Sequence, residues 1–161
     1  MRFLLVALLS LLCISCASSR KPASLKSVEI KEIKPRLIEE EQFKRISEYM
    51  TGKEYTGDRL ILRTDPEART GYYFTLVLDE KVRRLPSGTQ IIGEFHTAKE
   101  LDAQEHTFTV PAKRPKTKEI FVGLTGEDWP EGSVTPAAWR FTIKDPNGVV
   151  LATKKSYLWS L

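Results

Sequence analysis

The chain has little cysteine: Cys13 and Cys16 are the only two in its 161 residues. A domain that begins after residue 16 therefore has no disulfide of its own. The sequence also lacks a Gly-x-Ser-x-Gly elbow, a His-Glu-x-x-His pair, a phosphate-binding glycine loop and a Cys-His nucleophile pair. Because these absences remove the motifs of common hydrolases and phosphate-binding enzymes, we expect a protein that is not an enzyme and uses no cofactor.

A strong charge of one sign and a long apolar run are missing as well. The 25 Lys and Arg residues against 21 Asp and Glu give a net charge of +4, a mild excess that does not indicate nucleic-acid binding. The apolar run over residues 4 to 12 would form a helix of about 14 Å, under half of the ~30 Å of a bilayer core. Such a run has the length of a signal-peptide apolar region and is too short for a transmembrane helix.

The start of the chain resembles a bacterial lipoprotein signal peptide. Arg2 precedes the apolar run, and the small residue Ser15 stands directly before Cys16, although Cys13 occupies a position where Leu, Val or Ile is usual. The resemblance implies cleavage after Ser15, a diacylglyceryl group on the Cys16 thiol and a durable anchor made of two or three acyl chains. An ordinary secretory signal is the alternative.

A polar tether is expected to follow the signal of residues 1 to 15. Residues 16 to 36 are rich in Ser, Lys and Pro and have no sustained apolar face, which is typical of a linker. Within them, Ser27 to Ile33 alternates apolar and charged residues, so this part can join the folded domain as an edge strand. Ala17, not Asp, follows the cysteine, and the lipoprotein resemblance then implies the outer membrane, with the domain facing the periplasm.

Residues 37 to 161 are expected to form one folded domain built of short strands. From Arg59 onward, apolar residues recur with a period of two in segments separated by Gly, Pro, Asp and Asn, as in half-buried strands. We interpret residues 43 to 49 as a further strand, with a helix as the alternative because Glu39 to Glu41 would suit a first helical turn. The turn Asp145 to Gly148 is predicted to close a terminal hairpin. The strands expected after residue 58 are 59–63, 71–79, 89–97, 105–110, 118–125, 139–144 and 149–159.

Seven to eight short strands without a helix long enough for a crossover predict an all-β antiparallel sandwich. The pattern resembles immunoglobulin-like and fibronectin type III-like domains over roughly residues 43 to 160. This resemblance rests on the number and spacing of the strands, so it implies a fold and no chemistry.

The two histidines are the first candidates for a chemical site. Glu94 and His96 lie two apart on one expected strand and would point the same way, while His106 would approach them if the neighbouring strands paired. Zinc sites usually show tighter ligand spacing and a third protein ligand. We therefore expect surface strand residues and no metal, and we keep a small metal-dependent envelope hydrolase as the alternative function.

Trp129 and a basic loop are the candidate partner-binding residues. Trp129 stands between turn-forming residues, where it could stack on a sugar or anchor a partner unless it folds back over the sandwich. The basic loop could meet an acidic glycan, lipid headgroups or an acidic protein, with a solvated loop as the plain alternative. We expect a lipid-anchored envelope protein that binds a protein partner or an envelope glycan. The cations of the loop are Lys113, Arg114, Lys116 and Lys118.

Overall fold

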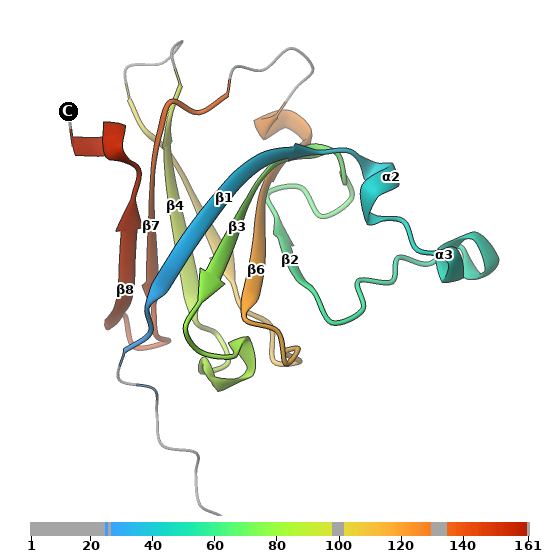
Figure 1. Ribbon diagram of the computed structural model, residues 1–161, viewed down its shortest axis with the longest axis horizontal. Coiled ribbons are helices and arrows are strands. Elements are labelled where there is room, and N and C mark those ends of the chain that lie inside the picture. Colours follow the sequence, from blue (N-terminus) through green and yellow to red (C-terminus); the bar gives the residue numbers. More distant parts are fainter. Residues whose placement is uncertain (1–24, 26, 98–101, 130–134, 161) are drawn as a thin grey trace, which may run out of the picture.

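The described part of the chain folds as two stacked β-sheets (Figure 1). A computed structural model describes residues 25, 27–97, 102–129 and 135–160. Within them, eight strands form two sheets of four, so the predicted all-β sandwich is confirmed. The first sheet has the order β1 (Ile30–Ile38), β3 (Gly71–Leu78), β6 (Glu119–Thr125) and β2 (Leu60–Arg63). The second has the order β5 (Gln104–Thr109), β4 (Gln90–His96), β7 (Ala138–Lys144) and β8 (Val150–Lys155).

The strand order follows that of immunoglobulin-type sandwiches with one addition. β1, β3 and β6 take the places of strands A, B and E, while β4, β7 and β8 take those of C, F and G, with β5 beside β4. β2 is the additional strand, and it pairs with β6 in parallel, with Leu60 beside Ile120. The other five neighbouring pairs among the described strands are antiparallel.

The main core lies between the two sheets and is built around three phenylalanines. The ring centroid of Phe74 lies 5.0 Å from that of Phe95 and 5.2 Å from that of Phe141. Buried aliphatic side chains surround these rings, and each one buried contributes roughly 1.5–3 kcal/mol to folding. They include Leu76, Leu78, Ile91, Ile120, Val122, Leu124 and Ile143.

The sandwich begins earlier in the chain than residue 37. Val28 is already buried, and β1 pairs with β3 from Ile30 beside Leu78 to Ile38 beside Gly71. β1 lies at the edge of its sheet, where a strand tolerates Pro35 because its outer side has no ladder partner. Residues 30 to 36 therefore belong to the sheet and not to the tether, and the edge strand expected within Ser27 to Ile33 is confirmed.

Two short helices occupy the segment after β1. They are α2 (Glu40–Phe43) and α3 (Ile46–Thr51), so the strand predicted over residues 43 to 49 was wrong and the helical alternative was right. Side chains three residues into each helix cap its start: the Gln42 amide oxygen accepts from the Glu39 N–H at 3.1 Å, and a Glu48 oxygen accepts from the Arg45 N–H at 3.3 Å. Such local caps satisfy backbone groups that a strand would have to pair elsewhere.

The C-terminal hairpin forms as predicted. The Asp145 carboxylate accepts the N–H groups of Asn147 and Val149, both at 2.8 Å, and Gly148 has a φ of 84°, a left-handed conformation that favours glycine. β8 ends at Lys155, earlier than expected, and a 3₁₀ turn follows it. The 3₁₀ turns are η2 (Val82–Arg84), η3 (Gly126–Asp128) and η4 (Tyr157–Ser160). None of the helices in the described ranges has the length and apolarity needed to cross a membrane.

Candidate binding site

A second, smaller core lies on the outer face of the first sheet, beneath α2. Phe43 from α2 packs on Tyr73 and Phe121, with ring centroids 4.9 and 6.4 Å away. Gly123 makes room for this arrangement, because a Cβ on it would lie 2.4 Å from a Tyr73 ring carbon. The outer face of the sheet is therefore covered at this place, and the chain after β1 is held against it.

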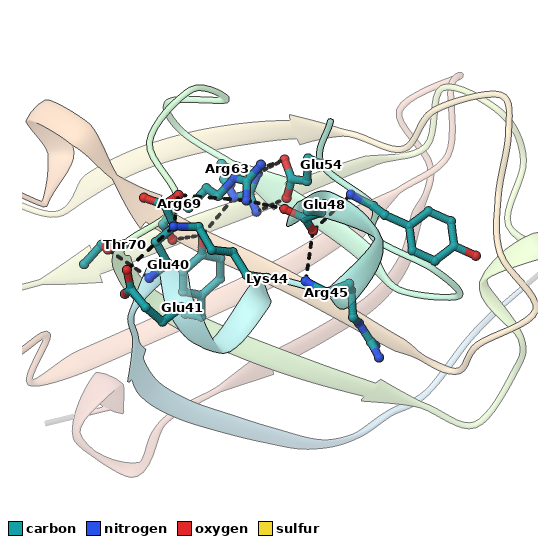
Figure 2. A network of polar contacts seen from close by, with 11 residues as sticks. Glu40, Glu41, Lys44, Arg45, Glu48, Glu54, Arg63, Arg69 and Thr70 are labelled. Carbon is teal, nitrogen blue, oxygen red and sulfur yellow. Dashed lines mark hydrogen bonds and ion pairs between the residues drawn. The ribbon is translucent and has the colours of Figure 1, made fainter. Parts of the chain in front are cut away.

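A network of ion pairs closes this small core (Figure 2). The Arg63 guanidinium donates to both Glu54 carboxylate oxygens, at 2.7 and 3.0 Å, and its Nε donates to the Tyr73 hydroxyl at 2.9 Å. The same guanidinium lies 5.3 Å from the centre of the Phe43 ring. The side chain of Arg63 is only 5% exposed, so this cation depends on the network for its partners.

Glu48 from α3 completes the network. One carboxylate oxygen accepts from Arg69 at 2.7 Å, and the other accepts from the backbone N–H groups of Arg45 and Tyr55 at 3.3 and 3.1 Å. The Tyr55 N–H, and after it Arg69, hold the pKa of Glu48 below its usual value despite burial. The Arg69 carbonyl in turn accepts from the Tyr73 hydroxyl at 2.7 Å, so α3 is fastened to the sheet through its glutamate.

Because Glu48 points inward, the apolar residues of α3 point outward. Ile46, Tyr49 and Met50 are 86%, 76% and 85% exposed, and their spacing of three and four residues places them on one side of the helix. We call these three residues the apolar face of α3. Large exposed apolar side chains gathered in one place mark an interaction surface more often than single ones do.

A basic pocket lies next to α3, formed by two adjoining cavities of about 580 and 740 Å³. Both cavities are lined by Tyr55, Asp58, Arg59 and Lys116; Arg45 lines the smaller one. We call the five residues Arg45, Tyr55, Asp58, Arg59 and Lys116 the basic pocket. Five cations and two carboxylates line the two cavities together, so the excess of positive charge suits an anion.

Among the described residues, no acidic side chain makes a hydrogen bond or ion pair with the arginines at this pocket. Neither Arg45 nor Arg59 makes a side-chain hydrogen bond or ion pair there, and the same holds for Arg36 on β1. Burial, and after it the positive charges of Arg45 and Arg36, lower the pKa of Arg59, while Glu119 offsets this weakly. The positive charges of Arg45 and Arg36 therefore act against the charge on Arg59, and an anion bound at the pocket would relieve this repulsion.

The structure divides the predicted basic loop into two pairs of cations. Arg114 donates to the Leu85 carbonyl, and the Lys118 ammonium donates to the Asp79 carbonyl at 2.6 Å. Lys113 and Lys116 are exposed and make no side-chain hydrogen bond or ion pair with the described residues. Arg114 and Lys118 thus hold the loop in place, and Lys113 and Lys116 remain for a ligand.

Trp129 does not stand free in its loop. Its ring stacks on Tyr72 with centroids 5.0 Å apart and planes at 30°, and it packs against the main core. The side chain is half-buried. This is the folded-back arrangement, so the structure does not present Trp129 as a stacking platform.

The two histidines face opposite sides of the second sheet. His106 lies beside Gly93 in the register and points toward Phe95 in the core, with its Nε2 3.9 Å from an Asp128 oxygen. His96, three residues beyond Gly93 on β4, lies against Trp159 on the outer face, with centroids 4.9 Å apart. Glu94 shares that face and pairs with Arg140. The structure therefore does not bring together the candidate metal ligands, and the described residues contain no cluster of three metal-ligating groups.

Cys16 lies outside the described residues, so its lipidation stays a prediction. The pocket residues Arg45, Tyr55 and Arg59 were missed from the sequence, although Lys116 was identified. A signal for α3 was present, since Ile46 and Met50 have helical spacing, but that spacing is ordinarily typical of a core-facing side.

No family model, curated protein or solved structure matches the chain at a significant level.

Proposed function

We propose that the protein is a lipid-anchored, non-enzymatic binding module of the bacterial cell envelope that holds an anionic envelope component in its basic pocket. The observation that carries this proposal is the set of cations without acidic partners, Arg45, Arg59 and Lys116, around one cavity. Opposed charges would ordinarily neutralise such cations within the fold, as Glu54 does for Arg63. Cations left unpaired at a concave surface attract anions and raise their local concentration.

The anchor in this proposal rests on Cys16. The cysteine follows Ser15 after a short apolar run, and the next described residues lead directly into the edge strand β1. An anchor that is joined to the sandwich by a short connection would keep the pocket close to the membrane. By the lipoprotein resemblance, Ala17 favours the outer membrane, with the sandwich in the periplasm.

The anchor is tested by intact mass spectrometry of the protein extracted from membranes, beside a Cys16→Ser variant. We expect a mass that corresponds to cleavage after Ser15 plus a diacylglyceryl group, and we expect that the variant lacks this group. Unlipidated masses for both proteins, differing only by the substituted residue, would contradict the assignment.

The pocket is tested by titration with dextran sulfate as a polyanion probe. Arg59→Gln and Lys116→Gln should each weaken binding several-fold, because each removes an unpaired cation from the cavity. Lys155→Gln is the matched control, since it removes the same charge from an exposed position on β8. Equal weakening by all three variants would show only a general charge effect and would remove the pocket from the proposal.

A further inference from the structure

The basic pocket alone does not explain the apolar face of α3. Ile46, Tyr49 and Met50 are each more than three-quarters exposed, and α3 stands away from both sheets at one end of the molecule (Figure 1). The fold does not need these residues at the surface for packing, since α3 is held by Glu48. An occupant that is apolar where it meets them would remove this surface from water.

The charges beside this face define the occupant further. Arg45 directly precedes α3 and lines the basic pocket together with Arg59 and Lys116. Lys53, shortly after the helix, is exposed and has no side-chain partner among the described residues. An apolar face bordered by free cations fits the headgroup boundary of an anionic bilayer, where tyrosine is also enriched.

The length of chain before β1 places a bilayer within reach. Val28, which is buried, lies twelve positions after Cys16, a contour of at most about 43 Å. β1 has nine residues and extends about 30 Å toward the α2 end of the sheet. A domain anchored at Cys16 can therefore lie along the membrane with α3 in contact with it.

A bilayer also fits the small size of the surface. Three apolar side chains on a six-residue helix bind a membrane weakly by themselves, and stable attachment generally needs two signals. The anchor would supply the first signal and hold α3 at a high effective concentration near the lipid. A freely diffusing protein partner would lack this advantage.

We infer that α3 docks on an anionic phospholipid surface, with Ile46, Tyr49 and Met50 inserted at the headgroup boundary and Arg45, Arg59 and Lys116 on the phosphates. The inference rests on the proposed function, because it uses the Cys16 anchor, and it names phospholipid phosphate as the anion of the basic pocket. Docking would orient the sandwich with its α3 end on the membrane.

The test uses the mature lipidated protein with Met50→Cys labelled by an environment-sensitive fluorophore. Cleavage after Ser15 removes Cys13 and lipidation consumes Cys16, so the new thiol is the only one in the chain. The protein is placed on vesicles of pure phosphatidylcholine or of equimolar phosphatidylcholine and phosphatidylglycerol, and the anchor holds it to both. We expect blue-shifted emission and quenching by bromine-labelled lipid only on the anionic vesicles, with reversal in high salt.

Variants and a control assign the effect to this surface. Arg45→Gln and Arg59→Gln should each reduce the ratio of docked to undocked protein about fivefold. The same label at Val149→Cys should stay in water on both vesicles, since Val149 is an equally apolar residue, 57% exposed, on the distant β7–β8 turn.

Two results would overturn this inference and leave the proposed function standing. In the first, the label at position 50 reports water on anionic vesicles to which the protein is attached. In the second, the label becomes shielded only after a purified soluble envelope protein is added, which would assign the apolar face of α3 to a protein partner. Failure of the anchor is distinguishable, because the protein would then not float with neutral vesicles, and that result would overturn both proposals.

Discussion

The two neighbouring helices α2 and α3 use their side chains in opposite ways. α2 turns Phe43 toward the sheet and leaves its glutamates Glu40 and Glu41 outside, as an ordinary surface helix does. α3, which begins three residues later, buries Glu48 and exposes Ile46, Tyr49 and Met50. α2 thus places an apolar side chain on the outer face of the sheet, whereas α3 places a carboxylate on Arg69, in the loop between β2 and β3.

The difference shows that partners, not hydrophobicity alone, decide which side of a short helix is buried. Tyr73 and Phe121 offer Phe43 an aromatic surface, whereas Arg69 and two backbone N–H groups offer Glu48 three donors. A carboxylate with several donors can be buried at little net cost. The consequence is that α2 fastens the segment and α3 presents apolar residues to the outside.

The largest expected effect comes from the apolar contact of α2. Phe43→Ala should lower the free energy of unfolding by about 3–5 kcal/mol, because it empties the small core over Tyr73 and Phe121. Urea denaturation followed by circular dichroism measures this loss. Met50→Ala on α3 is the matched control and should change the free energy by less than about 0.5 kcal/mol; equal losses for both would remove the distinction between the helices.

Breaking the ion-pair network should have the next largest effect. Arg63→Leu removes the hydrogen bonds to the Glu54 carboxylate and to the Tyr73 hydroxyl and leaves Glu54 with only Arg69 Nε, at 3.7 Å. We expect a loss of about 3 kcal/mol in the free energy of unfolding. Adding Glu54→Gln to this variant should restore part of the loss, since the carboxylate that lost its hydrogen bonds is then gone. A loss no larger than that of an exposed substitution would show that the network does not hold the small core closed.

Acid should weaken the attachment of α3 through its glutamate. The pKa values of Glu48 and Glu54 are lowered from 4.5, for Glu48 chiefly by the Tyr55 N–H and for Glu54 chiefly by Arg63. A lowered pKa contributes stability that is fully present above the unfolded pKa and is lost as the pH falls through the folded one. The free energy of unfolding should therefore fall below pH 4.5, and Glu48→Gln should make that fall shallower in urea titrations at a series of pH values. A fall equally steep in the variant would contradict the role given to Glu48.

The smallest effect on stability should come from the surface proposed to meet lipid. The double variant Ile46→Ser and Tyr49→Ser, carrying the label at Met50→Cys, should keep the free energy of unfolding within about 0.5 kcal/mol per substitution. The label on this variant should nevertheless stay in water on anionic vesicles. Urea denaturation and the vesicle assay on the same preparation separate these outcomes. A large fall in stability would mean that Ile46 and Tyr49 serve the fold.

The sandwich could be predicted from the sequence because a period of two reports which side of a strand is buried. Phe74, Leu76 and Leu78 followed that rule and line the main core. The terminal turn was equally local, since Asp145 caps residues two and four positions away. Such features depend on neighbours in the chain, so a single sequence contains them.

The candidate site could not be predicted in the same way, because its contacts are distant in sequence. Glu48 pairs with Arg69, which lies 21 residues further along the chain, and this pairing turns the apolar side of α3 outward. The register of β4 and β5 sets His106 beside Gly93 and so separates it from His96. Trp129 reaches Tyr72 across the fold. Lys116 was found because a basic loop is visible in the sequence, whereas Arg59 gains its importance from the cavity that it lines with Arg45 and Lys116.

The claim that α2 holds the segment to the sheet while α3 contacts the membrane is tested most directly by hydrogen–deuterium exchange of the lipidated protein on vesicles. The amides of Ile46–Thr51 should exchange more slowly on equimolar phosphatidylcholine and phosphatidylglycerol than on phosphatidylcholine alone, while those of the Asp145 to Gly148 turn exchange equally on both. Equal exchange of α3 on the two kinds of vesicle would contradict the account, because α3 would then expose its apolar face without a membrane to receive it.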